Sequence, residues 1–159
     1  PDIMEQPPRP VNEPIINREM LLGVVVQTVA TAGAVLAAFR IGLTRFDSLE
    51  EARTMAFVAL SGSELLRAYT ARSERLSVFH IGVFSNKWMQ WAVLASAVIL
   101  LATVYIPGLN NQVFGNVPLT LADWLVVLPV MLIPSAAAEV QKWVVRRLHA
   151  NKAGDAKTA

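Results

Sequence analysis

Four long apolar segments dominate this chain and limit what it can fold into. They run over Met20–Phe39, Ala52–Tyr69, Trp88–Ile106 and Leu121–Val145. A helix of about 20 residues spans the hydrocarbon core of a bilayer, and only helices or closed barrels satisfy every backbone group in lipid. The segments lack the two-residue alternation of barrel strands. The sequence therefore predicts an all-α membrane protein, a bundle of four transmembrane helices in contact with the lipid bilayer.

The composition agrees with a membrane location. Of 159 residues, 54% are hydrophobic and 16% are charged, and the mean hydropathy is +0.45. Soluble domains carry about 25% charged residues. The net charge is only +2 and the basic residues are scattered, so no nucleic-acid partner is expected. The chain has no cysteine and two distant histidines, which excludes thiolate sites and argues against a histidine-rich metal centre.

Polar and proline residues interrupt two of the apolar segments. Pro129 and Pro134 lie within the last segment, where they should kink the helix and release backbone carbonyls. Gln27, Thr28 and Thr31 lie in the first segment. Weakly polar side chains of this kind predict hydrogen bonds between neighbouring membrane helices.

The distribution of Lys and Arg predicts the orientation. Each Lys and Arg is assigned to the side of the membrane on which its tail or loop would lie. Eleven then share a side with the two termini, and three lie on the other side. Basic residues accumulate on the cytoplasmic side of membrane proteins, so both termini are expected to be cytoplasmic. The predicted organisation is a Pro-rich cytoplasmic lead-in over 1–19, a four-helix transmembrane domain over 20–145 and a basic cytoplasmic tail over 146–159.

Glu64 is the candidate functional residue. It lies within an otherwise apolar stretch, preceded by Ser61, Gly62 and Ser63, small residues that let a helix or an ion approach closely. A charge near mid-membrane costs on the order of 3 kcal/mol, and such residues usually serve ions, protons or substrate. The alternative is a structural carboxyl that is protonated or paired with Arg67, three residues later.

The other charged positions favour structural roles. Asp123 is expected in the first turn of the last helix, where a carboxylate complements the helix dipole. Glu139 and Lys142 are spaced to pair on one helix near the cytoplasmic interface. The segment Phe84–Trp88 is typical of a turn and N-cap before the third helix.

No catalytic signature is present in this sequence. It has neither a phosphate-binding GxxxxGK[ST] loop nor a dinucleotide fingerprint, and its two histidines do not support a Ser-His-Asp set. No catalytic or cofactor-binding residue is therefore assigned, and no cofactor is expected in this chain. From the residues alone, a stand-alone four-helix membrane protein, either a small transporter or an assembly subunit, stays an open alternative.

Several short motifs occur in a fixed order along the chain. They are Pro7-Pro8-Arg9, Glu13-Pro14-Ile15-Ile16, Ala52-Arg53-Thr54-Met55-Ala56, Ser85-Asn86-Lys87, Tyr105-Ile106-Pro107-Gly108, Phe114, Pro118-Leu119-Thr120, Asp123-Trp124-Leu125, Glu139 and Lys142. As an ordered set, from about Met4 to Lys142, they make the chain similar to the C-terminal region of type II P-type cation-transporting ATPases. The resemblance is greatest to the sarcoplasmic-reticulum-like calcium pumps.

The resemblance implies a specific place for each segment. The four segments would be the seventh to tenth membrane helices of a pump, and the lead-in would be the cytoplasmic loop after the sixth. Glu64 resembles the carboxylate that the eighth helix gives to a calcium site, the other ligands coming from the fourth, fifth and sixth helices. The lead-in departs from the family pattern at Gln6, where the family usually has a basic residue.

The resemblance also implies partners that lie outside this sequence. The parent protein would be an ATPase that uses ATP and magnesium and transports calcium, although this chain lacks the phosphorylated Asp and the nucleotide domain. The chain does not begin with Met, so it is expected to be a piece of something longer. In a bacterium its membrane would be the plasma membrane.

Overall fold

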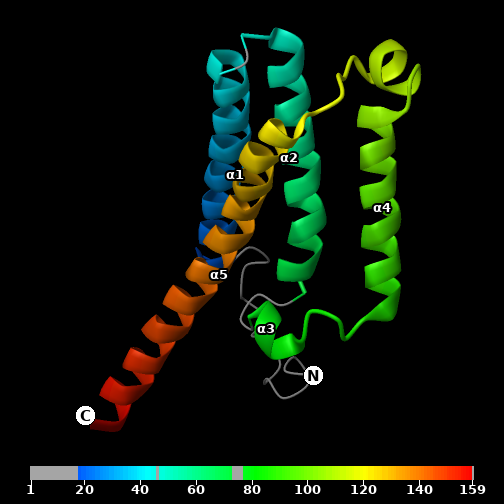
Figure 1. Ribbon diagram of the computed structural model, residues 1–159. Coiled ribbons are helices and arrows are strands. Elements are labelled where there is room, and N and C mark those ends of the chain that lie inside the picture. Colours follow the sequence, from blue (N-terminus) through cyan, green and yellow to red (C-terminus); the bar gives the residue numbers. More distant parts are fainter. Residues whose placement is uncertain (1–17, 46, 73–76, 159) are drawn as a thin grey trace.

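A computed structural model describes residues 18–45, 47–72 and 77–158, and this part of the chain is helical with no strand (Figure 1). The elements are α1 (Arg18–Arg45), α2 (Leu49–Thr70), α3 (Val78–Ile81), α4 (Lys87–Tyr105), the π-helix η2 (Leu109–Phe114) and α5 (Leu121–Thr158). The predicted all-α class is confirmed. The predicted lead-in lies outside the described residues except for the first residues of α1.

The four long helices run up and down, so their ends fall into two groups. The N-terminal ends of α1 and α4 lie at the same end of the bundle as the C-terminal ends of α2 and α5 (Figure 1). The connection between α1 and α2 and the π-helix η2 lie at the opposite end. The connections α1–α2 and α4–α5 therefore lie at one end and the connection α2–α4 at the other, as the count of basic residues requires. Which side of the membrane each end faces stays a prediction.

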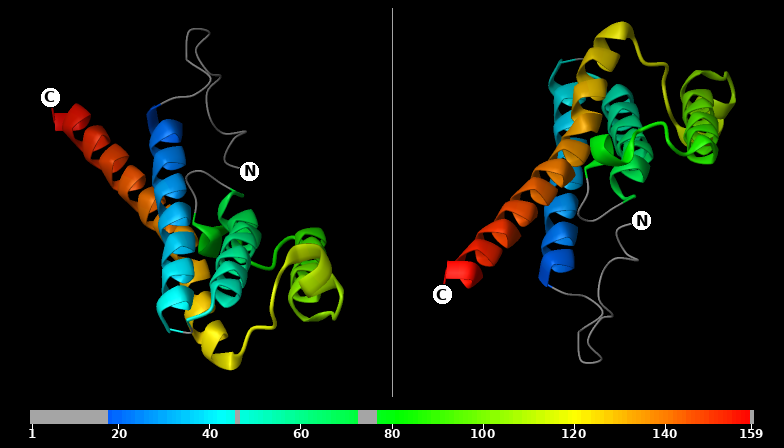
Figure 2. Two further views of the ribbon diagram at one scale, coloured as in Figure 1. Left: turned by 90° about the horizontal axis from the view of Figure 1, so that it is seen from above. Right: turned by 90° about the horizontal axis from the view of Figure 1, so that it is seen from below.

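Helix α2 is the central element of the bundle. It packs against α1 and α5 on one side and against α4 on the other (Figure 2). The main hydrophobic core gathers residues of α1, α2, the end of α4, the loop before α5 and the first half of α5. Its buried members are Ala34, Ala38, Met55, Val58, Ala59, Val104, Leu119, Val127 and Val130. The helix that carries Glu64 is therefore also the helix that the others surround.

Local sequence explains where α2 begins and which faces it buries. Ser48 caps the helix by accepting a hydrogen bond from the Glu51 amide at 3.2 Å, and acidic residues in the first turn complement the helix dipole. Two glycines allow close packing. A Cβ added to Gly42 of α1 would lie 2.7 Å from the Ala52 Cα, and one added to Gly62 would lie 2.8 Å from the Met131 Sδ of α5.

Three helical spans are long and apolar enough to cross a membrane. They are Met20–Arg45, Lys87–Tyr105 and Leu121–Arg147. Helix α2 is not among them, because charged residues occur in its first turns and around Glu64. The chain is thus a multi-pass membrane protein by its composition, and the crossing of α2 stays a prediction.

The ends of the helices do not always coincide with the ends of the apolar segments. Helix α1 continues to Arg45, past the predicted end at Phe39, and stops just before Asp47, which has a φ of 50°. Backbone hydrogen bonding continues through residues that would lie at the membrane surface, because a helix does not need apolar side chains there. Helix α5 continues through Pro129 and Pro134; the kink at these prolines stays a prediction.

Short capping contacts fix both ends of α4. The Asn86 side chain accepts hydrogen bonds from the amides of Trp88 and Met89 at 3.1 and 3.2 Å, which confirms the N-cap expected there. The helix ends at Tyr105, whose hydroxyl donates to the Leu119 carbonyl at 2.9 Å. The loop through η2 is therefore tied back to the helix that precedes it.

Candidate functional site

Glu64 lies near the C-terminal end of α2, six residues before the last residue of that helix, Thr70. The preceding residues Gly62 and Ser63 are buried, and Gly62 packs closely against Met131 of α5. Glu64 itself is directed toward α1, and its side chain is 48% exposed. One face of this part of α2 is thus fixed against α5, while the carboxylate is free to meet a ligand.

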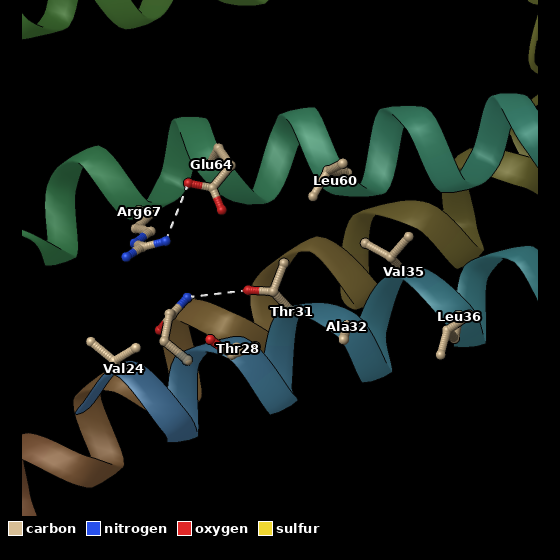
Figure 3. A pocket seen from close by; sticks show the side chains of 10 residues that line it. Val24, Thr28, Thr31, Ala32, Val35, Leu36, Leu60, Glu64 and Arg67 are labelled. Atoms are coloured by element: carbon tan, nitrogen blue, oxygen red, sulfur yellow. Dashed lines mark hydrogen bonds and ion pairs between the residues drawn. The ribbon is translucent and has the colours of Figure 1, made fainter. Parts of the chain in front are cut away.

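A hollow of about 560 Å³ lies between Glu64 and helix α1. Figure 3 shows Glu64 and Arg67 on α2 directed toward the α1 side chains across this space. The residues that line the hollow are Val24, Gln27, Thr28, Thr31, Ala32, Val35, Leu36, Leu60, Glu64 and Arg67. Its wall is mostly apolar, and its polar atoms are the carboxylate, the guanidinium, two hydroxyl groups and one amide.

Arg67 is a loose partner of Glu64. The Arg67 Nη1 and Glu64 Oε2 atoms are 3.5 Å apart, and the two side chains are 46% and 48% exposed. Exposed pairs of this length contribute little to stability. Within the described part of the chain the other oxygen of Glu64 makes no hydrogen bond or ion pair. The pairing expected under the structural alternative is present, but it leaves the carboxylate available.

The polar residues of α1 line the hollow. The Gln27 amide nitrogen donates to the Thr31 hydroxyl at 3.4 Å, one turn along the same helix, so among the described residues this pair bonds within α1, and its bonds to neighbouring membrane helices stay a prediction. The hollow separates these side chains from α2. Thr28 and Thr31 contribute hydroxyl oxygens to the wall that faces Glu64.

The arrangement offers part of a cation site. Hard divalent cations take six to eight oxygen ligands, including carboxylates. Among the residues that the structure describes, no group of three or more His, Cys, Asp or Glu side chains is placed to hold a metal ion. Glu64 can therefore give a cation one or two oxygens, but a complete shell requires ligands from elsewhere.

A second polar cluster holds the C-terminal end of α2. The Lys142 Nζ atom of α5 donates to the Thr70 carbonyl at 2.6 Å and to Glu139 Oε1 at 3.1 Å. The predicted pair of Glu139 and Lys142 is present. The Lys142 side chain is only 7% exposed, because α2 and its own helix cover it, and its place near the membrane interface stays a prediction. Sequence reasoning missed the bond to Thr70, because a backbone carbonyl carries no residue-type signal.

Asp123 lies in the first turn of α5, at the end of that helix opposite to Lys142. It is fully buried, and its Oδ2 atom accepts from the Thr120 amide and hydroxyl at 2.7 and 2.8 Å. The carboxylate thereby satisfies a free amide at the start of the helix. This is the structural role that its position in the first turn predicted.

Comparison with known proteins places the chain in a family. Residues 1–144 match the family model described as cation transporting ATPase, C-terminus. A calcium-transporting ATPase 1 from Bacillus cereus is 33% identical over 89% of this chain. A calcium-transporting ATPase 1 from Schizosaccharomyces pombe is 30% identical over 92%. The mouse calcium-transporting ATPase type 2C member 2 is 32% identical over 79%.

The chain is much shorter than these relatives. It spans 18%, 16% and 13% of the lengths of the three proteins, in the same order. The similarity therefore concerns one region of each relative.

Proposed function

This chain belongs to the family of cation-transporting ATPases, whose C-terminal region it matches, and on that premise we propose that it forms the last four membrane helices of a calcium pump. In this proposal Glu64 binds the transported calcium ion. Helices α1 and α5 hold α2 in place, and α2 presents the carboxylate. The pump as a whole would use ATP and magnesium, with an aspartyl-phosphate driving transport.

The observation that carries the proposal is the exposure of Glu64 on the most enclosed helix. Eight residues of α2 are buried, whereas the Glu64 side chain is 48% exposed toward a hollow of about 560 Å³. A charged residue at membrane depth is costly unless it meets an ion or a partner. Arg67 at 3.5 Å is a loose partner, so an ion would add the main stabilising interaction.

The remaining ligands must come from other membrane helices of the pump. A calcium ion needs six to eight oxygens, and Glu64 supplies two at most. The hollow opens beside α1 and α2, where a helix from the preceding part of the pump could contribute further oxygens. The proposal therefore predicts that this chain alone has no tight calcium site and no ATPase activity. Micromolar calcium affinity in the purified chain would contradict it.

Replacing Glu64 in the full-length pump tests the proposal. Glu64→Gln keeps the size of the side chain and one oxygen ligand, but it removes the negative charge that a divalent ion requires in a low dielectric. We expect phosphoenzyme formation from ATP to need about tenfold or more calcium, since loss of a charged contact is worth on the order of 1.5–3 kcal/mol. Phosphorylation from inorganic phosphate, which needs no bound calcium in this scheme, should be retained.

Glu50→Gln is the matched control. Glu50 is an exposed carboxylate in the first turn of the same helix, at the end opposite Glu64. Its replacement should leave the calcium dependence unchanged. Equal effects of the two substitutions, or no effect of Glu64→Gln, would refute the assignment of Glu64 as a ligand.

A further inference from the structure

We infer that Lys142 is a positioning residue for the Glu64 site, because its ammonium group fastens the C-terminal end of α2 to α5. The inference rests on the proposed function of Glu64 as a cation ligand. It concerns a contact that lies outside the hollow and touches no residue of its wall. Lys142 would act through the position of α2 and not by contact with the ion.

The contact with Thr70 is short and shielded from solvent. The Lys142 Nζ atom lies 2.6 Å from the Thr70 carbonyl oxygen, and the Lys142 side chain is 7% exposed. Thr70 is the last residue of α2. Carbonyls at a helix C-terminus lack partners within the helix and carry partial negative charge. A buried ammonium group at this place therefore both satisfies the carbonyl and complements the helix dipole.

Glu139 balances the buried charge and extends the contact to a third segment. Its Oε1 atom lies 3.1 Å from Lys142 and accepts a long bond, 3.5 Å, from the amide of Val78, the first residue of α3. The Ser77 side chain also hydrogen-bonds to this carboxylate. The pair thus joins the end of α2, the segment that enters α3 and one turn of α5. A buried lysine is tolerated only with such compensation.

The position of Glu64 depends on how α2 is held. Glu64 precedes Thr70 by six residues, about 9 Å along a helix that rises 1.5 Å per residue. Among the described residues its side chain has a hydrogen bond or ion pair only with Arg67, and that contact is loose, so its location follows the helix backbone. Calcium–oxygen distances fall within a narrow range of about 2.3–2.6 Å. A small shift or fraying of the last turns of α2 would therefore weaken the ion site.

The test uses the full-length pump with calcium as the probe. Lys142→Met keeps an unbranched apolar side chain and removes the ammonium group. We expect the calcium concentration for half-maximal phosphoenzyme formation to rise about three- to tenfold, which lies within the range that mutations in a packed network produce. The maximal level of phosphoenzyme and phosphorylation from inorganic phosphate should stay unchanged in the folded fraction.

Two further variants separate positioning from folding and from charge. The double variant Lys142→Met with Glu139→Gln leaves no unpaired buried carboxylate, so it should fold even if the single variant does not, and it should show the same calcium shift. Arg147→Gln removes an exposed basic residue of the same helix, whose guanidinium lies 4.4 Å above the Trp143 ring. It should leave the calcium dependence as it is.

Hydrogen exchange gives a readout that does not depend on transport. In the double variant the amides of residues 66–72 should exchange faster, because the last turn of α2 loses its fastening. Unchanged exchange, or an unchanged calcium midpoint in folded protein, would overturn the inference. If those results accompany a large rise in the calcium midpoint of Glu64→Gln, Glu64 is still assigned as a ligand and only the positioning role of Lys142 is rejected. An unchanged calcium midpoint in Glu64→Gln would overturn both the ligand assignment and the role of Lys142.

Discussion

Helices α2 and α4 are neighbours of similar length, 22 and 19 residues, yet they meet opposite surroundings. Helix α2 has eight buried residues and α4 has two. Helix α4 has no charged residue after Lys87, and it lies to one side of α2 (Figure 2). Helix α2 carries charges at both ends and is enclosed by α1, α4 and α5.

The difference between α2 and α4 shows that high hydropathy does not indicate burial inside the bundle of a membrane protein. Lipid tails are as apolar as leucine side chains, so an apolar surface gains little from contact with another helix. Helix α4 is easily recognised because it is apolar along nearly its whole length, and only two of its residues are buried against the described part of the chain. Helix α2 is the least apolar of the four because it faces protein and the hollow. Low hydropathy and burial in the bundle therefore go together in the helix that carries Glu64.

The largest difference in stability should appear when a core side chain is truncated. Met55 of α2 is fully buried, whereas Leu94 of α4 is 54% exposed. We expect Met55→Ala to destabilise the protein by about 2–3 kcal/mol through the cavity it leaves, a fall in melting temperature of about 4–12 °C. Leu94→Ala should change stability by less than about 0.5 kcal/mol. Thermal unfolding in detergent measures both, and equal losses would mean that α4 is as tightly packed as α2.

Close packing against α2 gives the next effect. A Cβ at Gly42 would lie 2.7 Å from the backbone Cα atom of Ala52, whereas a Cβ at Gly33 would meet nothing within 4 Å. Gly42→Ala should cost about 1–3 kcal/mol, because helices α1 and α2 must move apart. Gly33→Ala should be neutral or stabilising by up to about 1 kcal/mol, since it only improves helix propensity. A stable Gly42→Ala protein would show that the two helices do not meet there.

A smaller loss should follow removal of one buried hydroxyl group. The Thr54 hydroxyl of α2 accepts a hydrogen bond from the Val117 amide at 3.0 Å, which ties the loop after η2 to α2. Thr54→Val leaves that amide without its partner and should cost about 1–2 kcal/mol. Thr44 is exposed, and its hydroxyl bonds to carbonyls of its own helix within the described part of the chain, so Thr44→Val serves as the control. Similar melting temperatures for the two variants would contradict the role given to Thr54.

The smallest effect on stability is expected at the candidate site itself. Arg67 and Glu64 are about half exposed and 3.5 Å apart. Arg67→Gln should change stability by less than about 0.5 kcal/mol, as exposed ion pairs usually do. A loss above about 1 kcal/mol would favour a structural role for the pair and weaken the case for Glu64 as a ligand.

The sequence was most informative where composition and conformational signals coincide. The predicted start of α5 at Leu121 and the end of α4 near Ile106 agree with the structure to within a residue. Prolines and glycines follow the apolar run of α4, and Thr120 precedes α5. Helix α1 continues to Arg45, six residues beyond the apolar segment that ends at Phe39. There the apolar run stops while backbone hydrogen bonding continues.

The candidate site could be predicted only in part. Glu64 was identifiable because a carboxylate within an apolar run is expensive. The hollow beside it depends on how α1 and α2 are spaced, which no single segment encodes. The contact of Lys142 with Thr70 joins positions 72 residues apart through a backbone atom. Such a contact leaves no pattern in the identities of neighbouring residues.

Protection of Glu64 by calcium shows whether this carboxylate binds the transported ion. In the full-length pump, a hydrophobic carbodiimide should modify the Glu64 carboxylate in the absence of calcium, and mass spectrometry can locate the modification on α2. We expect calcium to prevent modification of Glu64, while Glu50 at the other end of the helix reacts equally with and without the ion. Modification of Glu64 that is independent of calcium would contradict the claim that this carboxylate binds the transported ion.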